Sequence, residues 1–111
     1  MECQIKKANR AMVISVAGRV DAVTAREFEN ESNAWTGEDE KGLVVDLTGV
    51  DYISSAGLRS FLVLGKRVKA AGGSLVLSGL NGMVRDVFDM SGFATLFPVY
   101  ATLEEAVESI K

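Results

Sequence analysis

Residues Asp51–Lys66, with the sequence DYISSAGLRSFLVLGK, contain the change of pattern that decides the fold. Just before them, the run LVVDL at residues 43–47 is almost wholly apolar, which is typical of a strand buried on both faces. After the serines, an apolar stripe at helical spacing is formed by Leu58, Phe61, Leu62, Gly65 and Val68. The stretch therefore predicts a buried strand that passes into an amphipathic helix, with Ser54 and Ser55 at the turn.

The residues before this unit predict a hairpin and a helix. Segments 4–8 and 11–17 predict two strands joined by the turn ANR, with Gly18 ending the second strand. Residues 21–35 predict an amphipathic helix that Asp21 caps and that ends before Gly37. The acidic run EDE that follows Gly37 indicates a solvated loop rather than a metal site, and Trp35 is expected in the core.

The residues after the unit predict two more strand-and-helix pairs. A strand is expected at 74–79, a helix at 81–92, an edge strand containing Pro98 at 96–100, and a last helix capped by Thr102. The order is then ββαβαβαβα. Such alternation predicts an α/β fold as a single domain over residues 1–111, with a mixed, mostly parallel sheet, an N-terminal hairpin and about four helices.

Composition excludes several classes of function. The 111 residues include no histidine and one cysteine, so a Ser-His-Asp triad, a histidine-ligated metal site and a thiolate cluster are all excluded. The net charge of −3 argues against a nucleic-acid partner, and Lys66, Arg67 and Lys69 are interpreted as a solvated face. No segment resembles a signal peptide or a membrane span, so we expect a cytoplasmic protein that does not insert into membranes and needs no cofactor.

The serine turn has two interpretations that the residues alone leave open. Serine is a favoured N-cap, and one such cap explains one of the two hydroxyls without any function. Alternatively, an exposed hydroxyl at a helix N-terminus tolerates an added phosphate well, because free N–H groups and the helix dipole favour negative charge. A catalytic serine is disfavoured, since Ile53 stands where a nucleophile elbow has glycine, and we expect no enzyme.

Three motifs in order resemble the STAS domain in its stand-alone form, the bacterial anti-sigma factor antagonists. These motifs are GRVDAVTA at 18–25, LVVDLTGVDYISSAGLRSFL at 43–62 and VFDMSGFATLFPVYATLEEAV at 87–107. The resemblance implies a protein-binding module, monomeric or weakly dimeric, with Ser55 as phosphorylation site and Ser54 as second choice. The partner-binding residues that it implies are Asp21, Thr24, Ser54, Ser55, Ala56, Gly57 and Arg59.

The resemblance also implies the partners. An anti-sigma factor that is also a serine kinase, with a histidine-kinase-like ATPase fold, would bind the unphosphorylated form and release its sigma factor. A metal-dependent serine phosphatase would reset the cycle. Ser54 stands where the family usually has Asp, and Arg59 is either a solubilising residue or one that reaches back to a phosphate on Ser55. The alternative is a non-switching STAS subunit of a transport complex or a signalling scaffold.

Overall fold

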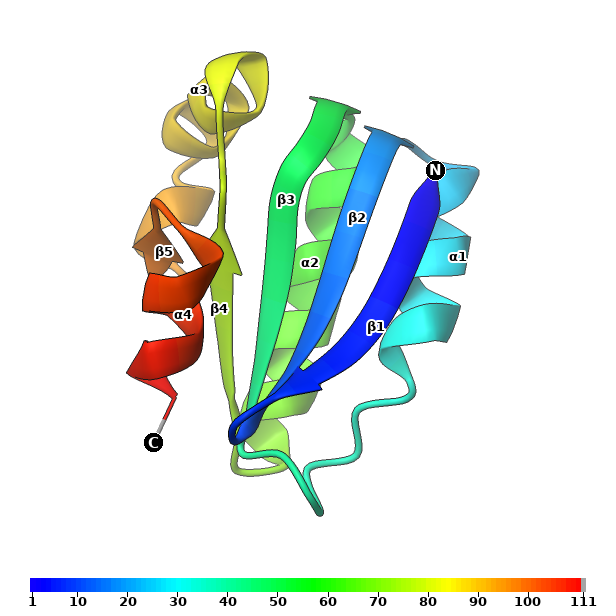
Figure 1. Ribbon diagram of the computed structural model, residues 1–111. Coiled ribbons are helices and arrows are strands. Elements are labelled where there is room, and N and C mark those ends of the chain that lie inside the picture. The colour runs from blue at the N-terminus through cyan, green and yellow to red at the C-terminus, as the bar shows by residue number, and fades with distance from the viewer. Residues whose placement is uncertain (111) are drawn as a thin grey trace.

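A computed structural model describes residues 1–110 and places the predicted strand-to-helix unit at its centre (Figure 1). The strand is β3 (Gly42–Ile53), and the helix is α2 (Ser55–Ala70). The other elements, in chain order, are β1 (Glu2–Ala8), β2 (Ala11–Val20), α1 (Thr24–Ser32), β4 (Ser74–Ser78), α3 (Gly82–Ser91), the short 3-10 helix η1 (Phe93–Thr95), β5 (Val99–Tyr100) and α4 (Leu103–Ser109).

The strands form one mixed sheet in the order β1-β2-β3-β4-β5. β1 and β2 pair antiparallel as a hairpin, whereas β2, β3, β4 and β5 are parallel. The predicted order ββαβαβαβα, the mostly parallel sheet and the four helices are therefore confirmed. Because the parallel strands share one direction, the loops that follow β2, β3 and β4 all lie at the same edge of the sheet.

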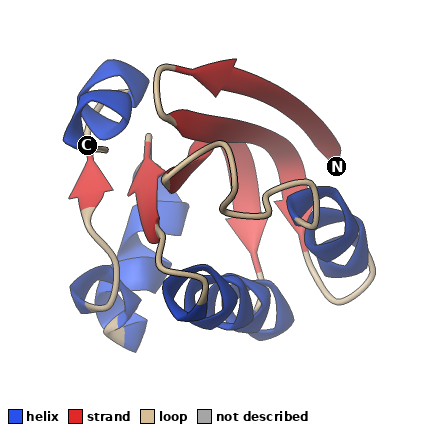
Figure 2. Ribbon diagram, turned by 90° about the horizontal axis from the view of Figure 1, so that it is seen from below, coloured by secondary structure: helices blue, strands red, loops and turns tan. Residues whose placement is uncertain are grey.

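The helices lie on both faces of the sheet, and each face has its own core. Figure 2 shows α1, α2 and α3 on one face and α4 alone on the other. The larger core lies under the three helices and includes Ile14, Val45, Leu47 and Leu77 of the sheet. The smaller core lies under α4 and consists of Ala11, Val13, Val44, Val76, Ala106 and Val107. Burial on both faces explains why the central strands are continuous apolar runs.

An aromatic cluster joins the three helices of the larger core. Phe61 of α2 contacts Phe28 of α1 edge to face, with ring centroids 4.8 Å apart, and lies 6.1 Å from the ring of Phe88 on α3. All three rings are fully buried. Edge-to-face pairs add to the gain from area burial, so Phe61 fixes the position of α2 against both neighbours.

Two strands extend beyond their predicted ends. β2 continues through Gly18 to Val20. Gly18 adopts a φ of 92°, and the pairing with β3 shifts its register at this residue and then continues. This positive φ is easy for glycine, so a bulge replaces the expected strand end. β3 likewise runs on past Leu47 to Ile53 and pairs with this extension of β2. β5, by contrast, is shorter than predicted and begins only after Pro98.

The end of α1 also differs from the prediction. The helix ends at Ser32, so Trp35 lies beyond it, although its side chain is buried as expected. Arg67 explains the early end: its guanidinium donates to the carbonyl oxygens of Ser32 at 2.7 Å and Trp35 at 3.1 Å. Arg67 is therefore a structural residue and not part of a solvated face. Within the EDE loop, Glu40 is buried and pairs with Lys7 at 3.6 Å, which corrects its assignment as solvated.

The aromatic cluster predicts a large difference between two substitutions on α2. Phe61→Ala should lower the free energy of unfolding by about 3–5 kcal/mol, because it leaves a cavity between three helices. Val63→Ala on the same helix should cost less than about 1 kcal/mol, since the Val63 side chain is 54% exposed. Urea unfolding followed by circular dichroism measures both, and equal losses would contradict the central role of Phe61.

Candidate functional site

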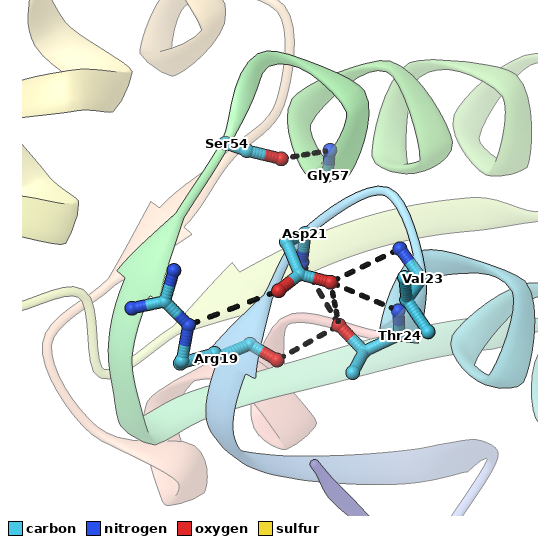
Figure 3. A network of polar contacts seen from close by, with 6 residues as sticks. All are labelled: Arg19, Asp21, Val23, Thr24, Ser54 and Gly57. Carbon is cyan, nitrogen blue, oxygen red and sulfur yellow. Dashed lines mark hydrogen bonds and ion pairs between the residues drawn. The ribbon is translucent and has the colours of Figure 1, made fainter.

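Two loops meet at the carboxyl edge of the sheet, one after β2 and one after β3. The Ser54 N–H donates to the carbonyl oxygen of Val20 at 2.9 Å, which ties the start of α2 to the end of β2. Gly57 makes this approach possible, because a Cβ at that position would lie 2.8 Å from the same oxygen. The geometry brings the Ser54–Gly57 turn beside the loop that begins at Asp21 (Figure 3). Separate stretches of sequence therefore form one surface.

The two serines have different structural roles. Ser54 is the N-cap of α2, has extended backbone geometry, and its Oγ accepts a hydrogen bond from the Gly57 N–H at 3.2 Å. Ser55 is the first helical residue and is exposed, and its hydroxyl has no hydrogen-bond partner among residues 1–110. The cap interpretation therefore accounts for Ser54 alone. It leaves Ser55 as an accessible hydroxyl whose presence the fold does not require.

Asp21 organises the neighbouring loop through a reciprocal pair of hydrogen bonds. Its Oδ1 accepts from the N–H groups of Val23 at 3.0 Å and Thr24 at 3.1 Å, and the Asp21 N–H donates to Thr24 Oγ1 at 2.8 Å (Figure 3). The Thr24 hydroxyl also donates to the carbonyl oxygen of Arg19 at 2.9 Å. Asp21 thus caps the first turn of α1 as predicted, although Val23 occupies the N-cap position itself.

These contacts keep Asp21 charged. The Thr24 N–H is the main cause that lowers the pKa of Asp21 below its ordinary value of 3.8, and the Val23 N–H, the Thr24 hydroxyl and the Arg19 guanidinium contribute in the same direction. Partial removal of the carboxylate from water opposes them. The loop therefore presents a fixed negative charge at neutral pH.

Arg19 and Tyr52 belong to this surface, although the sequence did not indicate them. The Arg19 guanidinium lies 4.1 Å from the centre of the Tyr52 ring and 3.7 Å from Asp21 Oδ2. The two side chains meet because the bulge at Gly18 shifts the register, so that Arg19 pairs with Tyr52. The sequence alone does not reveal the bulge, and without it the pairing of β2 with β3 would not place Arg19 opposite Tyr52. Figure 3 shows Arg19 reaching Asp21 from the strand before the loop.

The remaining predicted residues lie in the first two turns of α2, beside the same surface. Ala56 is half-buried, Gly57 is buried, and Arg59 is exposed on the next turn of α2, without an ion pair among the described residues. Val23, which the sequence did not single out, is 76% exposed beside Asp21. The arrangement combines an apolar residue, a fixed carboxylate and a free hydroxyl. Apolar and polar groups side by side are typical of surfaces that contact other proteins.

Residues 1–110 contain no group of three or more Cys, Asp or Glu side chains arranged to hold a metal ion. The same residues form no helix with the length and hydropathy of a membrane span.

The division between the serines predicts unequal effects on stability. Ser54→Ala should lower the free energy of unfolding by about 1 kcal/mol, because the Gly57 N–H loses its acceptor at the helix start. Ser55→Ala should change it by less than about 0.5 kcal/mol, since the hydroxyl has no partner to lose and alanine is a good helix former. Chemical denaturation of both variants measures the difference. A larger loss for Ser55→Ala would show that the roles are reversed.

The lowered pKa of Asp21 predicts a pH-dependent contribution to stability. Because the folded state favours the carboxylate, the contribution is fully present above the ordinary pKa of 3.8 and is lost as pH falls through the lowered folded value. Asp21→Asn should therefore be less stable than wild type at pH 6, and the difference should shrink at pH 3. Thermal unfolding at both pH values measures it, with Asp51→Asn as a control at an exposed carboxylate. A stability difference that does not vary with pH would argue against a lowered pKa of Asp21 in the folded state.

Comparison with known proteins identifies the family. The STAS domain family model matches residues 2–106. The chain is 37% identical over 111 residues to BtrV of Bordetella bronchiseptica, a proposed anti-sigma factor antagonist, covering 100% of this chain and 96% of that protein. It is 29% identical over 104 residues to the anti-sigma-B factor antagonist of Bacillus subtilis, or 94% of each chain. The crystal structure of an anti-sigma factor antagonist from Mycobacterium paratuberculosis superposes with a TM-score of 0.88 at 25% identity, covering 98% of this chain and 92% of that one. The chain therefore belongs to the STAS domain family.

Proposed function

We propose that this chain is an anti-sigma factor antagonist, a regulatory binding protein and not an enzyme. The observation that carries the proposal is the exposed, unpartnered hydroxyl of Ser55 at the first position of α2, beside the ordered Asp21 loop. The full-length similarity to proteins named as anti-sigma factor antagonists supports it. In this function the unphosphorylated chain binds an anti-sigma factor, which then releases its sigma factor.

The docking surface consists of the two loops at the carboxyl edge of the sheet. Its residues are Asp21, Thr24, Ser54, Ser55, Ala56, Gly57 and Arg59, with Val23 as an apolar contact. The network around Asp21 holds the first loop in place before any partner arrives, so that little conformational entropy is lost on binding. The second loop is held by the cap of Ser54 and by its bond to Val20. Preorganisation of both loops favours a protein partner that approaches as a rigid body.

Ser55 is the phosphate acceptor in this mechanism. Its Oγ attacks the γ-phosphorus of ATP bound to the kinase, the bond to the β-phosphate oxygen breaks, ADP leaves, and the hydroxyl proton passes to a base on the kinase. The phosphoserine then carries about −1.5 to −2 charges at pH 7. Ser54 is a poorer phosphate acceptor, because its Oγ is already engaged by the Gly57 N–H in the hydrogen bond that caps the helix.

The added charge acts on docking and not on the fold. The first turn of α2 contains no acidic residue, and the helix N-terminus favours a negative group. The folded chain therefore tolerates the phosphate. At an interface, however, the same phosphate must lose water, and a desolvated charge without a partner costs several kcal/mol. A cost of roughly 2.8 kcal/mol is enough to weaken binding about a hundredfold.

The resemblance to stand-alone STAS antagonists supplies the partners that we propose for this cycle. The anti-sigma factor is also the serine kinase and has a histidine-kinase-like ATPase fold, and a metal-dependent serine phosphatase hydrolyses the phosphoserine to restore binding. The antagonist is monomeric or weakly dimeric and acts in the cytoplasm, where ATP is available as phosphate donor.

Substitution of Ser55 tests the switch. Ser55→Ala should keep partner binding and abolish phosphorylation, whereas Ser55→Glu should weaken binding tenfold or more, because one carboxylate imitates part of the phosphate charge. Ser54→Ala should still be phosphorylated, since its neighbour is the acceptor. Phosphopeptide mapping of the tagged chain, isolated from its native host, identifies the modified residue. Affinity for the host's anti-sigma kinase is measured by calorimetry.

Three results would contradict the proposal. Phosphate on Ser54 alone would move the acceptor to the cap residue. Absence of any phosphate, together with the same partners captured by wild type and Ser55→Glu, would favour a non-switching STAS subunit in a transport complex or a scaffold. Capture of a partner other than an anti-sigma factor by both forms would reject antagonism itself.

A further inference from the structure

A groove lies at the other end of α2, away from the docking surface. It has a volume of about 370 Å³ and lies between the second half of α2, the start of β4 and the segment that precedes β5. Lys66, which lines it, is about 16 Å along the helix axis from Ser55 at 1.5 Å per residue. The volume is within the range of pockets that bind small molecules. The groove therefore needs an explanation separate from that of the docking surface.

The floor of the groove is apolar. Leu62, Leu75, Leu96, Phe97 and Pro98 all line it. Gly65 lets the Phe97 ring approach α2, because a Cβ on Gly65 would collide with that ring. Leu96 remains 56% exposed at the mouth. An apolar ligand group could therefore enter the groove and cover Leu96 without any rearrangement of the core.

The lining carries positive charge only. Lys66 and Lys69 lie three residues apart on one face of α2 and both line the groove, whereas no acidic residue does. Both lysines are exposed, and neither forms an ion pair with a carboxylate in residues 1–110. The chain as a whole has a net charge of −3. The groove is thus a local cationic site on an acidic protein, which is complementary to an anion.

The main chain of Leu75 supplies a polar group at the floor. The ladder between β4 and β5 begins at Leu77, whose N–H donates to the carbonyl oxygen of Pro98 at 2.9 Å. Extended back by two residues, the same register would set the Pro98 nitrogen against the Leu75 carbonyl oxygen. Proline has no N–H, so the ladder stops there. Leu77 and Gly79 both donate toward the β5 side, so the alternation along β4 turns the Leu75 N–H and C=O to that same side. Within the described chain, no hydrogen bond joins Leu75 to residues 96–98, and Leu75 lines the groove.

We propose that this groove binds a small amphipathic anion, a compact aromatic or aliphatic group that carries a carboxylate, sulfonate or phosphate. The apolar group lies on Phe97 and Leu96, and the acidic group pairs with Lys66 and Lys69. The main chain of Leu75 orients the ligand. The site is independent of the proposed phosphorylation switch, because it uses none of the residues of the docking surface.

Anilinonaphthalene sulfonate, an aromatic anion, is a suitable probe for the purified full-length chain. We expect saturable binding of one dye per chain, with shifts of the Gly65, Lys69 and Leu75 amide signals in nuclear magnetic resonance spectra. The uncharged analogue phenylnaphthylamine, which lacks the sulfonate, should bind about tenfold more weakly, since two exposed charge pairs are worth about that factor.

Matched variants separate the charge from the apolar surface. Lys66→Gln with Lys69→Gln should weaken binding of the anionic dye about tenfold and leave the neutral analogue unchanged. Lys6→Gln with Lys41→Gln removes the same charge at exposed sites outside the groove and should stay within about twofold of wild type. Leu96→Glu should weaken the anionic dye tenfold or more, whereas Met90→Glu, at another exposed apolar residue, should not. Thermal unfolding confirms that each variant is folded.

Several results would overturn the proposal. These are no saturable dye binding to wild type, equal losses for the two lysine pairs, equal affinity for the charged and neutral dyes, or amide shifts confined to the Ser55 surface. Dimers of the dye-free chain in sedimentation that Leu96→Glu abolishes would assign the groove to a second copy. None of these outcomes bears on phosphorylation of Ser55, so failure here and failure of the switch are distinguishable.

Discussion

The close approach of the start of α2 to the end of β2 is the constraint on which the candidate site depends. It requires a residue without a side chain at Gly57, because the Val20 carbonyl oxygen occupies the space that a Cβ would need. The same oxygen accepts the Ser54 N–H, so one main-chain atom positions both the helix and its cap. If this contact were longer, the Asp21 loop and the serine turn would separate and would no longer form one surface.

The site also separates the polar groups that stabilise the fold from the one hydroxyl that does not. Ser54 satisfies the Gly57 N–H, and Asp21 satisfies the first N–H groups around α1. Ser55 satisfies nothing in the described chain and is exposed. The two adjacent hydroxyls therefore contribute differently to the stability of the fold, which the sequence alone could not show. A residue whose chemistry is not needed for folding is free to be modified without loss of structure.

The sequence predicted the elements with strong periodicity and missed features that depend on distant contacts. The apolar run of β3 and the stripe of α2 were sufficient for the fold class, because burial on both faces and helical spacing leave few alternatives. The end of α1 was missed, since its termination depends on the guanidinium of Arg67, more than thirty residues away in the chain. The pair of Arg19 and Tyr52 depends on a bulge at Gly18, and bulges shift register without a clear sequence pattern. The apolar and cationic groove could not be predicted either, because it forms only where α2 meets residues 96–98, which are distant in the sequence.

The two outer strands of the sheet have a consequence for behaviour at high concentration. β1 carries the exposed lysines Lys6 and Lys7, and charged side chains on an edge strand hinder pairing with a foreign strand. At the opposite edge, β5 has only two residues and follows a proline, so it offers little main chain to recruit another molecule. Neither border of the sheet can readily serve as a template for amyloid-like growth. Both edges of the sheet therefore disfavour strand-to-strand aggregation, and neither protection involves the loops at the carboxyl ends of the strands.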